Sequence, residues 1–305
     1  MNIRKFITSP NWLGIFILLG LLSQGIYAEQ KKMKILVSIE PIALIIRDLV
    51  GEHADVEALV AGAASPHHYS LAPSQLQQLN SADLIIWIDP HFEFFMAKVM
   101  VQLMSSGKRV MQLSTLDGIT WPEKYRDHSA AHDHDGDHDF HLWLNPENVK
   151  VVAKNIQRTL HTMPSVNIQK VAVDVDAYVV SLDALMTELM LLFNHVEYKK
   201  YAAFHDAYGH FTEAFNLTQV DFVAQVPDEQ ISGKRLLSLK SSFKDATCLI
   251  ADTLEVAEAQ KMSRLLKLPV VQVDVLAVEQ HQPTFGYSNY LRNMAVNFST
   301  CLHMK

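Results

Sequence analysis

The sequence predicts an α/β fold, because short apolar segments with strand character alternate with amphipathic segments of helical character. The alternation begins at Lys34 and continues to about Gln112. It begins again near Tyr201, after a long helical stretch without proline or glycine. Strands separated by helices are typical of a parallel sheet. The chain has 305 residues, which is enough for two domains of ordinary size.

In the first half, four apolar segments are expected to be strands. Pro41 marks the start of the first helix, since proline is favoured in the first helical turn. The expected strands are Lys34–Ile39, Asp55–Val60, Leu84–Ile88 and Arg109–Gln112, and the expected helices are Pro41–Leu49, Ser74–Asn80, His91–Leu103 and Pro146–Met163.

A single long helix is expected next, over residues 166–194, because this stretch contains neither proline nor glycine. Its about 29 residues would measure roughly 43 Å at 1.5 Å per residue. It could be a rigid connector between two domains or an ordinary long packing helix.

The second half repeats the strand and helix pattern of the first. Two candidate ligands, His205 and Asp274, stand at ends of expected strands, where an α/β domain presents its ligand-binding side chains. The expected strands are Tyr201–Phe204, Val220–Val226, Cys248–Ala251 and Val270–Val275, and the expected helices are Val256–Leu266 and Tyr287–His303.

Residues 1–28 have the pattern of a secretory signal peptide. Arg4 and Lys5 give a basic start, Trp12–Leu22 is an apolar core, and Ala28 offers an acceptable cleavage site. The alternative is an uncleaved membrane anchor, although the apolar core is short for a bilayer span. The formal net charge of −7 makes the chain a poor nucleic-acid binder and a plausible acceptor of cations.

Three histidines in well-separated segments are candidate metal ligands. His67 lies in a loop, His141 begins a short apolar stretch, and His205 ends an expected strand. Alone, each has an ordinary explanation as a solvated, buried or helix-capping residue. Together, in an acidic chain, they indicate a zinc site, because neutral imidazole is the commonest side-chain ligand of Zn²⁺. Asp274 is a possible fourth ligand, and water is the alternative.

An acidic, histidine-rich run covers residues 127–139 and should be mobile, because its composition cannot fill a core. Ligands without a folded scaffold must be ordered on binding, so any extra zinc should bind here more weakly. A solvated loop without a role is the alternative. The histidines of this secondary site are His128, His132, His134 and His138.

A zinc-dependent hydrolase using the same three histidines is the alternative from another class. It would need a general base beside an open zinc site, as in the His-Glu-x-x-His motif. The sequence has no such motif, no Gly-x-Ser-x-Gly, no Walker sequence and no dinucleotide-binding glycine pattern. A binding protein is therefore the preferred interpretation.

The chain contains 2 cysteines, Cys248 and Cys301. An even number in an exported protein suggests one disulfide. It would close a loop of about 54 residues and could add roughly 4 kcal/mol of stability. Two reduced core thiols or a metal site are the alternatives.

Four segments together carry a family resemblance: residues 62–71 (GAASPHHYSL), 81–84 (SADL), 141–146 (HLWLNP) and 204–209 (FHDAYG). They resemble those of the periplasmic zinc-binding proteins of ABC importers, the ZnuA type within the cluster A-I, or family 9, metal solute-binding proteins. The similarity extends over essentially the whole chain after the signal. The segments 141–146 (HLWLNP) and 204–209 (FHDAYG) are highly specific in combination.

The resemblance implies two Rossmann-like α/β lobes joined by a long rigid helix, with a metal cleft between them. It implies a receptor, not an enzyme, that is a monomer in the periplasm and carries Zn²⁺ to an ABC permease with its cytoplasmic ATPase. It also implies His67, His141 and His205 as ligands, a Cys248–Cys301 disulfide and the histidine-rich loop. The corresponding division is a signal at 1–28, lobes at 29–165 and 197–305, and a connecting helix at 166–196.

The chain departs from the family pattern at two places. Pro66 stands where close relatives can have glutamate, so no carboxylate ligand comes from that position. Asp274 is followed by Val-Leu-Ala instead of the usual Pro-Leu-Gly, so the local turn can differ and water can take the fourth position. Manganese receptors of the family usually have glutamate where His205 stands. Three nitrogen ligands favour zinc, and a manganese or iron receptor, or a metal-binding adhesin, is the alternative within the family.

Overall fold

The computed structural model describes residues 32–60, 64–123, 138–163, 168–197, 199–227, 229–279 and 285–304. The chain divides into the units Met1–Lys32 and Met33–Lys305, and the account below concerns the second. This unit contains two parallel four-stranded sheets with the same strand order, β2-β1-β3-β4 and β6-β5-β7-β8. The strands are β1 Met33–Ile39, β2 Ala54–Val60, β3 Leu84–Trp87, β4 Val110–Gln112, β5 Lys200–His205, β6 Thr218–Ala224, β7 Leu249–Asp252 and β8 Val270–Val273.

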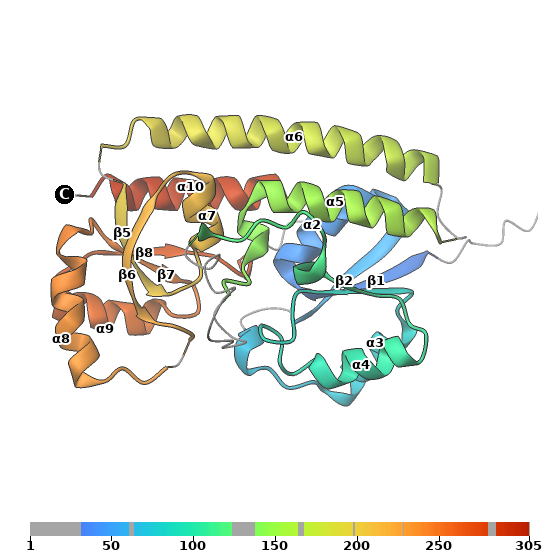
Figure 1. The fold of residues 1–305 in the computed structure, drawn as a ribbon, viewed down its shortest axis with the longest axis horizontal. Helices are drawn as coiled ribbons and strands as arrows, with labels where there is room; N and C mark the ends of the chain where they lie inside the picture. Colours follow the sequence, from blue (N-terminus) through green and yellow to red (C-terminus); the bar gives the residue numbers. More distant parts are fainter. Residues whose placement is uncertain are drawn as a thin grey trace, which may run out of the picture. The chain divides into compact units, whose positions relative to one another are not determined.

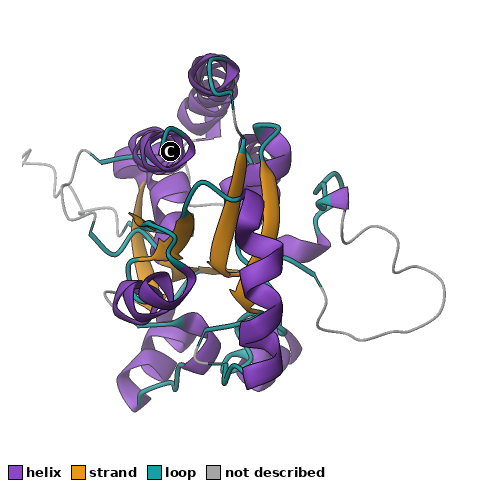
Figure 2. Cartoon of the chain, turned by 90° about the vertical axis from the view of Figure 1, so that its left-hand side faces the viewer, coloured by secondary structure: helices purple, strands orange, loops and turns teal. Residues whose placement is uncertain are grey.

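Helices cover both faces of each sheet, which explains why the strands are nearly continuous apolar runs. In β1, Ile35 and Val37 face one core while Leu36, between them, faces another, because successive side chains point to opposite faces. Figure 2 shows strands between helices above and below them. The helices are α2 Glu40–Val50, α3 Pro73–Ser81, α4 Ala97–Ser105, α5 Pro146–His161, α6 Ile168–Asn194, α7 Gly209–Ala214, α8 Gly233–Ser242, α9 Val256–Leu266 and α10 Tyr287–Leu302.

The predicted α/β class with two lobes is confirmed, and the long helix is α6, of 27 residues. It runs along α5 and α10 (Figure 1): α10 packs against the second sheet, and α5 packs against α2, which covers the first sheet. At 1.5 Å per residue α6 is about 40 Å long. Within the described ranges, no helix is long and apolar enough to cross a membrane.

One hydrophobic core is shared by the two lobes. It contains residues of both sheets together with α2, α5, α6 and α10. Trp143, fully buried, donates its indole N–H to the carbonyl of Val275 and to the hydroxyl of Tyr290, at 3.2 and 3.1 Å. Tyr287 in turn donates its hydroxyl to the carbonyl of Trp143 at 2.8 Å. The segment that begins with His141 is therefore attached to the second lobe, although it belongs to the first half of the sequence.

The predicted helix His91–Leu103 is wrong at its start, since α4 begins only at Ala97. Before Ala97, nearby side chains accept hydrogen bonds from backbone N–H groups, and the backbone forms turns there instead of a helix. Glu93, fully buried, accepts the N–H groups of Ile88 and Asp89 at 2.7 and 3.2 Å. Asp89 accepts the N–H of His91 at 2.9 Å. Such local side-chain acceptors compete with helical hydrogen bonds.

Candidate metal centre

Three histidines meet between the two lobes. His67, His141 and His205 each offer a ring nitrogen, and these nitrogens lie within 4.8 Å of one another. The ring centroids are 6.1 Å apart for His67 and His141, 6.3 Å for His67 and His205, and 5.6 Å for His141 and His205. The structure thus brings together the three residues that the sequence singled out.

Each histidine is placed by a different local structure. His67 lies in a short 3₁₀ helix, Pro66–His68, whose preceding Ser65 accepts the His67 N–H at 3.3 Å. His141 begins the apolar turn that leads into α5, whose first residue is Pro146. His205 is the last residue of β5, at the carboxyl end of a central strand.

Buried carboxylates hold two of the imidazoles. Asp139 Oδ1 lies 2.7 Å from His141 Nδ1, and Glu255 Oε2 lies 2.7 Å from His205 Nδ1. Such a pair fixes the Nδ1–H tautomer and leaves Nε2 bare for a metal. His205 Nε2 is buried and has no hydrogen-bond partner among the described residues. A metal ion would satisfy this otherwise unpartnered nitrogen, so the residues fit an ion such as zinc.

The electrostatics follow from burial and from these pairs. Burial and, to a smaller extent, the neighbouring His141 and His205 together lower the pKa of His67 to about 2. Burial alone would lower the pKa of His205, but the hydrogen bond and charge of Glu255 outweigh it and raise the value. Burial would raise the pKa of Asp139, but its hydrogen bond with His141 holds the value well below the ordinary range. The neutral form of the His67 imidazole is therefore strongly favoured, while His205 holds its proton more tightly than usual.

The three rings line a small cavity of about 30 Å³, enough for a single ion or water. Its wall is mostly apolar and includes Pro66, Leu254 and Val275. Asp252 also lines it, but its two oxygens accept the N–H groups of Leu254 and Val275 at 2.9 and 2.8 Å. Burial raises the pKa of Asp252 to about 6. Asp252 therefore shapes the turns around the cavity.

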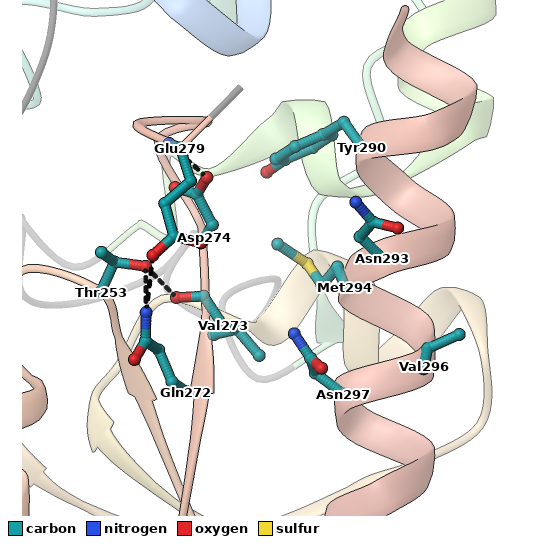
Figure 3. A pocket seen from close by; sticks show the side chains of 10 residues that line it. All are labelled: Thr253, Gln272, Val273, Asp274, Glu279, Tyr290, Asn293, Met294, Val296 and Asn297. Atoms are coloured by element: carbon teal, nitrogen blue, oxygen red, sulfur yellow. Dashed lines mark hydrogen bonds between the residues drawn. The ribbon is translucent and has the colours of Figure 1, made fainter. Parts of the chain in front are cut away.

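Asp274, the expected fourth ligand, is not brought to the three histidines. Its Oδ1 accepts the N–H of Val278 at 2.7 Å, and its Oδ2 accepts that of Glu279 at 2.9 Å. It lines a separate cavity beside α10, shown in Figure 3 with Tyr290 and Asn293. Asp274 does not meet the expectation because β8 ends at Val273, and the backbone of the turn that follows donates its N–H groups to the Asp274 carboxylate.

The secondary histidines are placed only in part. His128, His132 and His134 lie outside the described residues, as does the run itself up to residue 137. His138 is exposed, with its ring 5.2 Å from that of Trp121 and 6.1 Å from that of Phe140.

Sequence reasoning missed both supporting carboxylates. Asp139 precedes His141 by two residues, and this Asp-x-His spacing is a signal that could have indicated it. Glu255 is 50 positions from His205, and the sequence holds no local signal for that pair.

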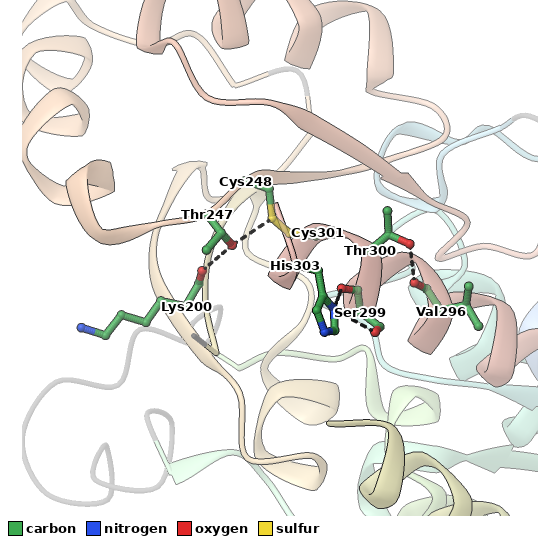
Figure 4. The surroundings of a disulfide bond; sticks show 8 residues. All are labelled: Lys200, Thr247, Cys248, Val296, Ser299, Thr300, Cys301 and His303. Atoms are coloured by element: carbon green, nitrogen blue, oxygen red, sulfur yellow. Dashed lines mark hydrogen bonds between the residues drawn. A yellow bond between two sulfur atoms is a disulfide. The ribbon is translucent and has the colours of Figure 1, made fainter. Parts of the chain in front are cut away.

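Cys248 and Cys301 form a disulfide, with their Cα atoms 5.5 Å apart. Both are fully buried, and the bond joins the residue before β7 to the end of α10 (Figure 4). The disulfide prediction is confirmed, against the alternatives of free thiols or a metal site.

This chain has two parallel-sheet lobes with three imidazoles gathered between them, and this arrangement is typical of two-lobed metal-binding proteins. A family model described as "Zinc-uptake complex component A periplasmic" (ZnuA) matches residues 35–301, and the chain belongs to this family. The family is one of periplasmic receptors for metal uptake, not of enzymes.

Curated relatives and solved structures agree with this membership. The chain is 29% identical to the high-affinity zinc uptake system protein ZnuA of Haemophilus ducreyi, with 88% of this chain and 93% of the relative covered. It is 26% identical to the protein of the same name in Brucella abortus, over 88% and 91%. A crystal structure of ZnuA superposes with a TM-score of 0.73 at 23% identity, covering 89% and 99%. The periplasmic zinc-binding protein TroA from Treponema pallidum gives 0.74 at 16% identity, over the same shares.

Proposed function

We propose that this protein is a periplasmic receptor that binds one Zn²⁺ through His67, His141 and His205 and delivers it to an ABC permease for zinc uptake. One observation carries the proposal: three ring nitrogens converge at a buried point, and the Nε2 of His205 has no other partner there among the described residues. The names of the curated relatives, which are zinc uptake proteins, support the choice of metal.

The donor set favours zinc over harder ions. Three imidazole nitrogens suit Zn²⁺, whereas manganese and magnesium prefer oxygen-rich ligands. This argues against the alternative of a manganese receptor. With Asp274 engaged by its own turn, we assign the fourth position to water. Glu255 Oε1, buried and without a partner within the described ranges, lines the same cavity and can accept a hydrogen bond from that water.

The hydrolase alternative finds little support in this centre. A zinc hydrolase needs a carboxylate or histidine free to take a proton from the bound water. Both oxygens of Asp139 are engaged, by His141 and by the N–H of Gly209, so Glu255 Oε1 is the acceptor at hand, and the size of the cavity decides the question. The cavity of about 30 Å³ leaves room for the ion and no substrate.

Export and delivery belong to the same proposal. Residues 1–28 are a signal that is cleaved, and the mature protein is a periplasmic monomer. It docks on the permease, whose cytoplasmic ATPase drives uptake. The lobes are 29–165 and 197–305, and the helix 166–196 connects them.

Metal binding by variants tests the centre. Calorimetric titration of zinc should give one tight site in the wild type, and His67→Ala, His141→Ala and His205→Ala should each weaken it strongly. His195→Ala, at an exposed histidine that directly follows the end of α6, is the matched control and should bind as the wild type does. Retention of a tight one-to-one site in the triple variant, with the histidine-rich run deleted, would refute the assignment.

We further propose that the run 127–139 binds additional zinc weakly. Deleting residues 128–138 should leave the tight site and remove the weaker ones. If the stoichiometry at saturating zinc is the same with and without the run, it is not a metal site.

A further inference from the structure

His91 repeats, at the surface, the hydrogen-bond geometry of a buried ligand. In the centre, Asp139 Oδ1 accepts the His141 backbone N–H at 3.0 Å and lies 2.7 Å from its Nδ1. Two residues after Asp89, His91 makes the same pair of contacts with Asp89 Oδ1, at 2.9 and 2.8 Å. Both segments thus read Asp-x-His and use one carboxylate oxygen for both bonds.

The carboxylate behind His91 is fixed as firmly as the one behind His141. Asp89 Oδ2 accepts the hydroxyl of Ser114 at 2.6 Å and the amide of Gln112 at 3.1 Å. Asp139 Oδ2 accepts the N–H of Gly209 at 2.8 Å. A carboxylate held in this way orients an imidazole and raises its basicity as a metal ligand.

The two histidines differ in exposure. The side chain of His91 is 45% exposed and that of His141 is 7% exposed. With Nδ1 occupied by Asp89, the free nitrogen of His91 is Nε2, to which no described residue forms a hydrogen bond. An imidazole that is oriented through Nδ1 and exposes its other nitrogen to solvent can offer that nitrogen to a metal ion.

Short aromatic contacts link His91 to the centre. Its ring stacks on Phe140, with centroids 6.0 Å apart and an interplanar angle of 11°. Phe140 directly precedes His141. The residue after His91, Phe92, contacts the rings of His67 and His141, at 4.8 and 5.2 Å. The exposed imidazole of His91 and the Phe92 ring that packs against the buried histidines therefore belong to one segment, 89–92, which contacts the segment 139–141.

We propose that His91 is an outer zinc ligand, one aromatic layer removed from the centre through Phe140 and Phe92, which holds the ion transiently while it is loaded into the buried site. Asp89 supplies the second-shell carboxylate, and water completes the coordination. A single imidazole with water ligands releases zinc readily, which suits a loading position. This inference rests on the proposed zinc-receptor function.

Imidazole ¹⁵N NMR and loading kinetics test it together. In mature protein already holding one zinc, His91 should show the Nδ1–H tautomer, and added zinc should shift its Nε2 signal. Asp89→Asn should raise the zinc concentration needed for that shift about tenfold. Transfer of zinc from a chromogenic chelator to the metal-free protein should be several-fold slower in His91→Ala and in His91→Gln. His195→Ala, an exposed histidine with no carboxylate contact among the described residues, should load at the wild-type rate.

The outcomes separate the two proposals. An Nε2 signal of His91 that saturating zinc leaves unmoved, or loading of both His91 variants at the wild-type rate, would overturn the outer ligand while the tight site persists. Absence of a tight site in the wild type would overturn the receptor function itself.

Discussion

Glu93 should make the metal-free protein less stable as the pH rises. Burial raises the pKa of this fully buried carboxyl from 4.5 to about 7, against the opposing hydrogen bonds from the backbone N–H groups of Ile88 and Asp89. Below pH 4.5 the group is protonated in both the folded and unfolded states, so it costs nothing. Between pH 4.5 and 7 only the unfolded state releases the proton, and stability is lost as the pH rises. Above pH 7 the full cost applies.

The magnitude follows from the pKa. At about 1.36 kcal/mol per pH unit, a rise from 4.5 to about 7 corresponds to about 3 kcal/mol. In Glu93→Gln the amide oxygen can still accept the N–H groups of Ile88 and Asp89 but carries no charge. The variant should therefore be more stable than the wild type at pH 8, by up to about 3 kcal/mol, and about equal to it at pH 4.5.

Urea unfolding of both proteins at pH 4.5 and pH 8 measures the difference in stability. A chelator is present because bound zinc would add its own stabilisation. Glu52→Gln, at an exposed position, is the control and should change stability by less than about 0.5 kcal/mol at either pH. The reasoning is refuted if the difference between Glu93→Gln and the wild type is the same at pH 4.5 and pH 8.

Three further predictions concern the centre and the disulfide. Zinc affinity should rise with pH through the raised pKa of His205, because the ion must displace its proton; calorimetry at pH 7.5 and pH 5 showing equal affinities would contradict this. Glu255→Gln should weaken zinc binding about 10- to 100-fold, since it removes the carboxylate that orients His205, whereas exposed Glu258→Gln should bind normally. Replacing Cys248 and Cys301 by serine should lower unfolding stability by about 4 kcal/mol without abolishing zinc binding, and labelling of unreduced, denatured wild type should find no free thiol among its cysteines.

The lobes could be predicted from sequence because their strands are buried on both faces. The strand Leu84–Trp87 is apolar throughout, and the helices between the strands indicate a parallel arrangement. The three histidines could be proposed because each stands at a strand end or in a loop, where α/β folds place ligands.

Contacts between residues distant in sequence could not be predicted. The pair of His205 and Glu255 depends on β5 and β7 lying side by side, which no local pattern specifies. Asp274 has the right position at a strand end, but the direction of its side chain is decided by the turn that follows. The turns at His91–Met96 replaced a predicted helix because buried Glu93 captures backbone donors.

Because the His141 segment is attached to the second lobe, two of the three histidines are held by that lobe and one, His67, is held by the first. Asp139 receives the N–H of Gly209, and Trp143 donates to Val275, so His141 and His205 share one rigid frame. His67 stands on a separate loop after β2, held across the opening by a contact of 3.3 Å between its neighbour His68 and the carbonyl of Pro227. In the proposed three-histidine site, withdrawing that one loop would take a single nitrogen from the ion and leave the other two at their mutual distance. Release would then need the departure of one ligand, not the separation of the two lobes.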